Sequence, residues 1–223
     1  MVMTFAPGNV AHADDVYQYK VLPGSAAWAT LKTHQQMVDA VKIPAETIRG
    51  MSTGQLADAV LDYPLLPDAL AFNDVQEGIE TVAGRFEGLR ELLRRPDAGA
   101  VLLDRYRDLE IRTNAAASLR QAGDHTLEVW KVETLLAQPQ VLASLPAGQV
   151  TELLRLGLEK YQAKQANATV YGQAGLEPTA VVLGRALAIR EGWNWRESSL
   201  LRTAAESTGT GTAATVQAVR EHL

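Results

Sequence analysis

The fold is decided by residues 51–109, which read MSTGQLADAVLDYPLLPDALAFNDVQEGIETVAGRFEGLRELLRRPDAGAVLLDRYRDL. Ser52 and Asn73 can each accept a hydrogen bond from an N–H of the first helical turn, which has no partner within the helix. Gln55 and Gln76, each three residues further on, can bond back to the capping residue. These two capping boxes predict helices that begin after residues 52 and 73.

Prolines separate the predicted helices. Pro64 and Pro96 lack an N–H and carry a ring that collides with the preceding helical turn, so a helix ends before each of them. The stretch therefore predicts three helices. The first begins at residue 53, the second and longest covers residues 74–95, and the third begins near Ala98.

The second helix has the clearest apolar pattern of the chain. Its apolar residues recur at steps of three and four, so they form one stripe: Val75, Ile79, Val82, Phe86, Leu89 and Leu93. Gly78, Gly84 and Gly88 interrupt this helix, although each glycine costs roughly 1 kcal/mol relative to alanine. Our interpretation is close approach by a neighbouring helix, and a hinge or a ligand groove is the alternative.

The rest of the chain up to residue 167 has the same texture of short amphipathic segments ended by proline or glycine. Leu92–Pro96 (LLRRP) resembles Leu135–Pro139 (LLAQP) at an offset that suits two-helix solenoid repeats. We therefore predict an all-α fold, either a helical-hairpin array or an irregular bundle, with a solenoid as an open alternative. The predicted helical domain covers residues 16–167.

A second region, residues 168–223, has a different pattern. Residues 168–171 (ATVY) and 179–183 (TAVVL) are rich in β-branched and aromatic residues, and a stretch with glycine and proline lies between them. This pattern predicts a small β-hairpin within residues 168–187, although Val181–Ile189 is also compatible with a helix. Helices are predicted to follow the hairpin.

The first 15 residues contain Ala11-His12-Ala13, an A-x-A pattern typical of the cleavage site of a secretory signal peptide. A basic start and a complete apolar segment are missing from residues 1–15. These residues are therefore interpreted either as a signal-peptide remnant or as a disordered lead. The first interpretation predicts a secreted or extracytoplasmic protein, and the second is compatible with a cytoplasmic one.

Composition excludes several classes of protein. Of the 223 residues, 47% are hydrophobic and 21% are charged, which is ordinary for a globular protein. The chain has no cysteine, which excludes disulfides, thiolate metal sites and cysteine nucleophiles. The net charge of −5 provides no basic field for nucleic acid, and no run of about 18 apolar residues is present. Neither nucleic-acid binding nor a membrane span is therefore predicted.

No catalytic, cofactor-binding or metal-binding residues emerge from the sequence. The four histidines are scattered without the spacing of a metal site: His12, His34, His125 and His222. The carboxylates fall mostly on polar faces of predicted helices, close to basic residues. Tyr63, Trp193 and Trp195 form a candidate interaction surface if their rings are exposed. If they are packed, they only stabilise helix junctions.

A family resemblance rests on short strings within residues 28–109. They are Trp28…Leu31, Ile43-Pro44, Met51-Ser52-Thr53, Tyr63-Pro64-Leu65, Ala71-Phe72-Asn73, Phe86-Glu87-Gly88-Leu89 and Leu92-Leu93-Arg94-Arg95-Pro96-Asp97-Ala98. Together they resemble a family of bacterial α-helical proteins, many of them exported, whose activity is not known. The resemblance implies that a hairpin follows the helices, and that longer members continue with a segment containing Cys and His. This chain has no cysteine, so the resemblance supplies no site residues.

The predicted function is an extracytoplasmic helical module that binds a protein or serves as an accessory domain, without catalysis of its own. A protein partner is expected, while its identity and the oligomeric state of the chain stay open. The alternative is a cell-envelope hydrolase that uses carboxylates the sequence does not identify. A cleft joining two desolvated carboxylates would favour the hydrolase.

Overall fold

The computed structural model describes residues 16–112, 119–194 and 209–223, and every regular element in these ranges is helical. The prediction of an all-α fold is therefore confirmed. The helices are α1 (Ala26–Ala29), α2 (His34–Ala40), α3 (Ala45–Gly50), α4 (Thr53–Leu61), η1 (Leu66–Ala71), α5 (Val75–Arg85), α6 (Glu87–Leu92), α7 (Ala98–Asp108), α8 (Leu119–Leu136), α9 (Pro139–Ala143), α10 (Ala147–Ala166), α11 (Ala168–Glu191) and α13 (Gly209–His222). Residues 1–15, with the predicted signal-peptide remnant, lie outside the described residues.

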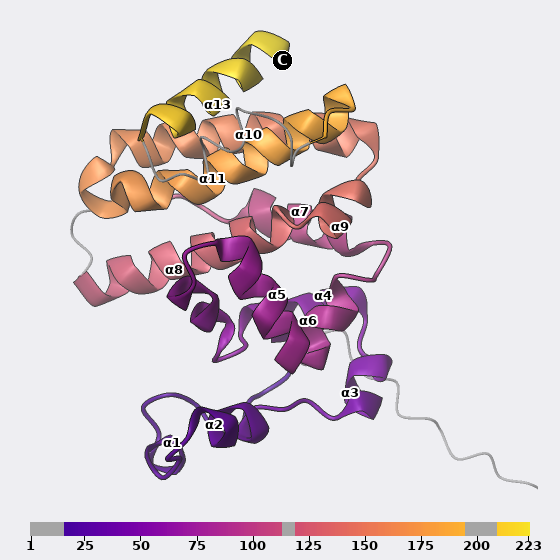
Figure 1. Cartoon of the computed structure of the whole chain (residues 1–223), viewed down its shortest axis with the longest axis vertical. Helices are drawn as coiled ribbons and strands as arrows, with labels where there is room; N and C mark the ends of the chain where they lie inside the picture. The colour runs from indigo at the N-terminus through magenta and orange to yellow at the C-terminus, as the bar shows by residue number, and fades with distance from the viewer. Residues whose placement is uncertain (1–15, 113–118, 195–208) are drawn as a thin grey trace, which may run out of the picture.

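Along the long axis of the molecule, the N-terminal helices lie towards one end and the C-terminal helices towards the other (Figure 1). The short helices α1 and α2 lie at one end, and α10, α11 and α13 lie at the other. In the middle, α4 packs against α6 and α7, and α7 packs against α8, α9 and α10. At the C-terminal end, α11 packs along α10 and carries α13 on another side.

Capping residues start the helices much as the sequence indicates. Thr33 with Gln36 and Ser52 with Gln55 form complete capping boxes at the starts of α2 and α4. At α5 the cap is Asp74, whose side chain accepts from the N–H of Gln76, so the prediction of Asn73 was wrong by one residue. A carboxylate at this position also interacts favourably with the helix dipole.

The predicted long helix is in fact two helices, because Phe86 has an extended backbone between α5 and α6 (φ −119°, ψ 105°). The apolar stripe nevertheless identifies the core, since Ile79, Val82, Phe86 and Leu89 are all buried. Close approach explains Gly78, where an added Cβ would lie 2.8 Å from Cα of Ala69 in η1. It does not explain Gly84, where an added Cβ would meet no atom within 4 Å.

Arginines hold the N-terminal layers together. Arg105 of α7 donates to both carboxylate oxygens of Asp58 in α4, at 2.7 and 2.8 Å. Arg95 donates to the carbonyl oxygens of Ile48 and Met51, which close the C-terminal end of α3. The conformation of the chain before α4 therefore depends on a side chain more than forty residues away.

The predicted β-hairpin within residues 168–187 is wrong, because these residues belong to α11. The helical alternative for Val181–Ile189 is confirmed. Val182 and Leu183 are fully buried in this helix, which packs along α10. Burial of this kind outweighs the modest preference of β-branched residues for strands. The stretch expected to form the turn instead kinks the helix, with Gly172 in a non-helical conformation (φ 55°, ψ −165°) and Pro178 inside the helix.

Among the described residues, no helix is both long enough and apolar enough to cross a membrane.

Candidate functional site

A buried polar cluster lies where α7, α8, α10 and α11 meet. Each helix contributes one side chain, namely Tyr106, Glu133, Lys164 and Thr179. Lys164 Nζ lies 2.7 Å from Glu133 Oε2, and the two side chains are 1% and 0% exposed. Tyr106 and Thr179 have no exposed surface either. We call these four residues the buried cluster.

Every polar hydrogen of the buried cluster has an acceptor. The Lys164 ammonium donates to Glu133 Oε2, to Thr179 Oγ1 at 2.8 Å and to the carbonyl oxygen of Gly175 at 3.0 Å. The Thr179 hydroxyl donates to Glu133 Oε1 at 2.8 Å, and the Tyr106 hydroxyl donates to the same oxygen at 3.0 Å. An ammonium has three hydrogens to donate, so Lys164 has none left for a ligand.

Burial governs the protonation of the cluster. It lowers the pKa of Lys164, while the adjacent Glu133 carboxylate opposes this shift. Burial also raises the pKa of Tyr106 well above its ordinary value, and the negative charge of Glu133 adds to the rise. Tyr106 therefore remains a neutral hydrogen-bond donor to Glu133.

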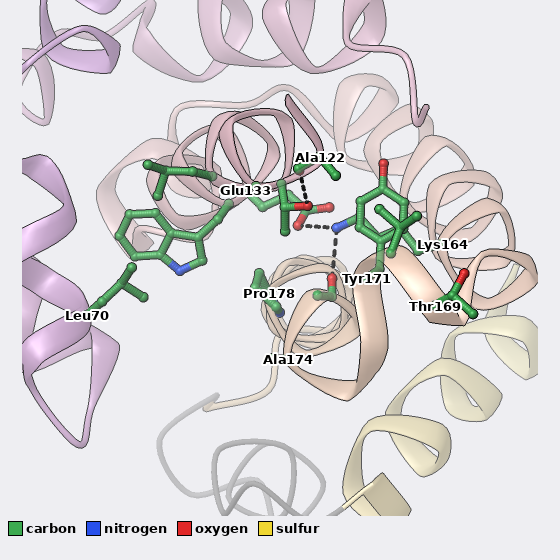
Figure 2. Close-up of a pocket in the computed structure, with 14 residues that line it drawn as sticks. Leu70, Ala122, Glu133, Lys164, Thr169, Tyr171, Ala174 and Pro178 are labelled. Carbon is green, nitrogen blue, oxygen red and sulfur yellow. Dashed lines mark hydrogen bonds and ion pairs between the residues drawn. The ribbon is translucent and has the colours of Figure 1, made fainter. Parts of the chain in front are cut away.

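A pocket of about 590 Å³ lies above the buried cluster. Its walls come from η1, α8, α10 and α11, and they consist of Leu70, Ala122, Gly123, Thr126, Leu127, Trp130, Glu133, Lys164, Thr169, Val170, Tyr171, Ala174, Gly175 and Pro178. Figure 2 shows Leu70 at one end of the pocket, with Glu133 in the middle and Lys164 and Tyr171 towards the other end. The volume is within the usual range for ligand pockets of proteins.

The accessible surface of this pocket is mainly apolar. Glu133 and Lys164 contribute to its floor, but their exposure of 0% and 1% leaves almost none of their surface open to a ligand. Leu70 is 52% exposed, so its side chain adds apolar surface at the pocket. The pocket therefore offers a ligand an apolar surface, with the charged pair beneath it.

Two irregularities of α11 shape one wall of the pocket. The kink at Gly172 separates Tyr171 from the rest of the helix, and the Tyr171 hydroxyl donates to the carbonyl oxygen of Arg112 at 3.2 Å. Pro178 has no N–H to donate to the carbonyl oxygen of Ala174, four residues earlier. Ala174 and Pro178 both line the pocket.

Of the three aromatic residues predicted as an interaction surface, the structure describes Tyr63 and Trp193. Tyr63 is 2% exposed, and its ring stacks on Phe86 with 3.8 Å between the ring centroids. Tyr63 therefore packs at a helix junction rather than on a surface. Trp193 is 40% exposed and meets the His222 ring edge-on. Trp195 lies outside the described residues.

The described histidines are dispersed as well. His34 Nε2 lies 2.6 Å from Asp68 Oδ2, and His125 Nδ1 lies 3.4 Å from Glu128 Oε2. His222 Nδ1 lies 2.8 Å from a carbonyl oxygen of its own helix. Within the described parts of the chain, no three His, Asp or Glu side chains gather closely enough to hold a metal ion.

Neither a family model nor a solved structure matches the chain. The chain is 29% identical over 102 aligned residues to the DNA-directed RNA polymerase subunit beta of Bifidobacterium adolescentis, in a match that covers 41% of this chain. The match spans 9% of that subunit. A similarity of this extent does not place the chain in a family.

The buried cluster was missed at the sequence level, although a signal for it exists. Glu133 is the one acid in residues 129–136 (VWKVETLL), of which five are apolar. Lys164 gives no such signal, because it lies in the polar stretch Glu159–Asn167. Pairing these two residues requires knowing that α8 and α10 are neighbours.

Proposed function

We propose that this protein is a helical protein-binding module, and that its pocket receives an apolar side chain of a partner protein. The observation that carries the proposal is an open apolar pocket above a charged pair that is already satisfied. Binding energy at protein interfaces is concentrated in a few apolar or aromatic side chains that fill such pockets. Leu70, half-exposed at the edge of the pocket, provides further apolar surface for the partner.

The arrangement of carboxylates supports binding over the alternative of a hydrolase. Among the described lining residues, Glu133 is the single carboxylate. Its oxygens already accept from Tyr106, Thr179 and Lys164. Hydrolysis of glycosidic bonds by paired acids generally needs two carboxyl groups facing the scissile bond. No observation in the described structure favours the hydrolase.

The same proposal extends to the kind of partner and its location. A protein partner agrees better with the net charge of −5 than a nucleic acid does. A location outside the cytoplasm rests on the Ala11-His12-Ala13 pattern alone. Trp193 stays a candidate for a separate contact with the partner, because its ring is partly exposed.

A peptide-display selection with two glycine variants tests the proposal. Gly123 lines the pocket, and an added Cβ would meet no atom within 4 Å, so Gly123→Leu fills space without a clash at Cβ. A Cβ added at Gly148 on α10 would also meet no atom within 4 Å, and Gly148 does not line the pocket. Gly148→Leu is therefore the matched control. Leucine is also the better helix former in both variants.

We expect the library to yield peptides that bind the wild-type chain and the Gly148→Leu variant but not the Gly123→Leu variant. Their shared feature should be a large apolar residue. A library that yields no peptide with this profile would contradict the proposal. Thermal unfolding of both variants checks that they fold as the wild type does.

A further inference from the structure

We propose that His125 of α8 is a pH-sensitive latch, which holds the chain after α7 at neutral pH and releases it in acid. The residue that it holds is Arg112, whose backbone also binds Tyr171 in the wall of the pocket. Acid should therefore loosen this wall. The inference concerns the protein itself and does not depend on what the pocket binds.

The backbone of Arg112 is held from two helices. Its N–H donates to Nε2 of His125 at 3.4 Å. Its carbonyl oxygen accepts from the Tyr171 hydroxyl of α11 at 3.2 Å. The two side chains that hold it, His125 and Tyr171, are 5% and 4% exposed. Both contacts share one residue, so a change at His125 reaches Tyr171 through Arg112.

The hydrogen bond from Arg112 defines the neutral form of the His125 ring. A neutral imidazole has one N–H and one acceptor nitrogen. Nε2 is the acceptor here, so the hydrogen is on Nδ1. Nδ1 is buried and has no hydrogen-bond partner among the described residues, although Glu128 Oε2 lies 3.4 Å away. The ring therefore lies between a backbone N–H on one side and a carboxylate on the other.

Protonation of His125 breaks the contact with Arg112 and strengthens the one with Glu128. Histidine ordinarily changes its charge between about pH 5 and pH 8. An imidazolium carries a hydrogen on both nitrogens, so Nε2 would no longer accept and would face the Arg112 N–H as a second donor. The cation would also be attracted to the Glu128 carboxylate, 3.4 Å from Nδ1.

The other titratable groups around this contact agree with release in acid. Arg112 is itself a cation, so its charge adds to the repulsion from the protonated ring. Burial raises the pKa of the Tyr171 hydroxyl, which therefore keeps its hydrogen in acid. Lys160 of α10 donates to the carbonyl oxygen of Leu109, and acid favours this protonated, donating form. Acid should therefore release Arg112 while Leu109 stays held.

NMR titration of the full chain from about pH 8 to pH 5 tests the latch. Long-range ¹H–¹⁵N spectra give the tautomer and the charge of His125, while the Arg112 amide and the Tyr171 ring report the two contacts. We expect the Nδ1–H tautomer at the alkaline end. On acidification the Arg112 amide proton should shift upfield, because its hydrogen bond is lost. The Tyr171 ring resonances should shift with the same midpoint as His125.

Three variants separate the latch from a general effect of acid. His125→Gln cannot be protonated, so the shifts of Arg112 and Tyr171 should be lost. Glu128→Gln removes the attracting carboxylate and should move the midpoint of His125 to lower pH, with Arg112 following it. The Glu128 side chain is 60% exposed, so this variant serves even if His125→Gln does not fold. His222→Gln, at an exposed position of α13, is the control and should leave both shifts unchanged.

Several results would overturn the inference. They are an Nε2–H tautomer at the alkaline end, an Arg112 amide that does not shift while His125 becomes protonated, and the same shift in His125→Gln. Tyr171 resonances that do not follow the Arg112 amide would overturn the link to the pocket wall. The proposed function is tested by peptide binding at a fixed pH, so the two proposals can fail separately.

Discussion

Lys164 Nζ lies 2.7 Å from Glu133 Oε2 inside the protein, and neither side chain is more than 1% exposed. The pair joins α10 to α8, and its hydrogen bonds extend to Tyr106 on α7 and Thr179 on α11. Removing two charges from water is costly, and mutual attraction with complete hydrogen bonding offsets much of that cost. The pair therefore fixes how four helices meet beneath the pocket.

Breaking this pair should be costly, and removing both charges should be much less so. Lys164→Met leaves the Glu133 carboxylate buried without its cation, and we expect a loss of about 3–5 kcal/mol in the free energy of unfolding. Adding Glu133→Gln to that variant removes the unpaired charge, so the double variant should recover at least half of the loss. Urea denaturation of the two single variants and the double variant measures the coupling. If the double variant loses as much unfolding free energy as the two single variants together, the two charges act independently.

The glycines of α5 provide a matched comparison on one helix. Gly78→Ala places a Cβ against the backbone of Ala69, and we expect it to destabilise the protein by about 1–3 kcal/mol. The Cβ that Gly84→Ala adds would meet no atom within 4 Å, so this variant should be more stable than the wild type by up to about 1 kcal/mol. Thermal unfolding of the two variants distinguishes them by the sign of the shift in Tm. A shift of the same sign in both would contradict the packing of η1 on α5.

Tyr63 should make the protein sensitive to alkaline pH. Burial raises the pKa of Tyr63 to about 12, whereas an unfolded tyrosine loses its proton near its ordinary pKa of 10.0. Between these values the unfolded chain releases a proton that the folded chain retains, so stability falls as pH rises. We expect Tyr63→Phe to keep the stacking on Phe86 and to reduce the loss between pH 10 and pH 11 by about 1 kcal/mol. Denaturation at pH 7 is the control, and an identical loss above pH 10 in both proteins would refute this account of Tyr63.

Arg95 should not be replaceable by lysine. Its guanidinium reaches the carbonyl oxygens of Ile48 and Met51 at the same time, which a lysine ammonium on a different stem cannot reproduce. We expect Arg95→Lys to cost about 1–3 kcal/mol in unfolding free energy. The neighbouring Arg94 is exposed, so Arg94→Lys is the control and should be close to neutral. Equal effects of the two substitutions would argue against the anchoring of α3 by Arg95.

The helical class was predictable from the sequence because caps, prolines and apolar spacing are local. Thr33 and Ser52 cap their helices as expected, and Ile79, Val82 and Leu89 of the stripe are buried. The hairpin prediction within residues 168–187 failed because strand preference is weak compared with burial along α10. Local sequence does not reveal which helix lies beside a segment.

The candidate site was predictable only in small part. Of the residues singled out from the sequence, Tyr63 is packed inside and Trp193 lies outside the pocket. The pocket is built from η1, α8, α10 and α11, which are separated by up to about a hundred residues of chain. Glu133, the one acid in the mostly apolar residues 129–136, was a weak local signal, and its partner Lys164 had none.

The most direct test of the central claim is the dissociation constant of one display-selected peptide, measured by isothermal titration calorimetry against three proteins. These are the wild type, the pocket-filling Gly123→Leu variant and the matched Gly148→Leu variant. If the pocket receives the partner's apolar side chain, Gly123→Leu should weaken binding at least about tenfold, a loss of roughly 1.4 kcal/mol, and Gly148→Leu should leave it unchanged. The same dissociation constant for all three proteins would contradict the claim.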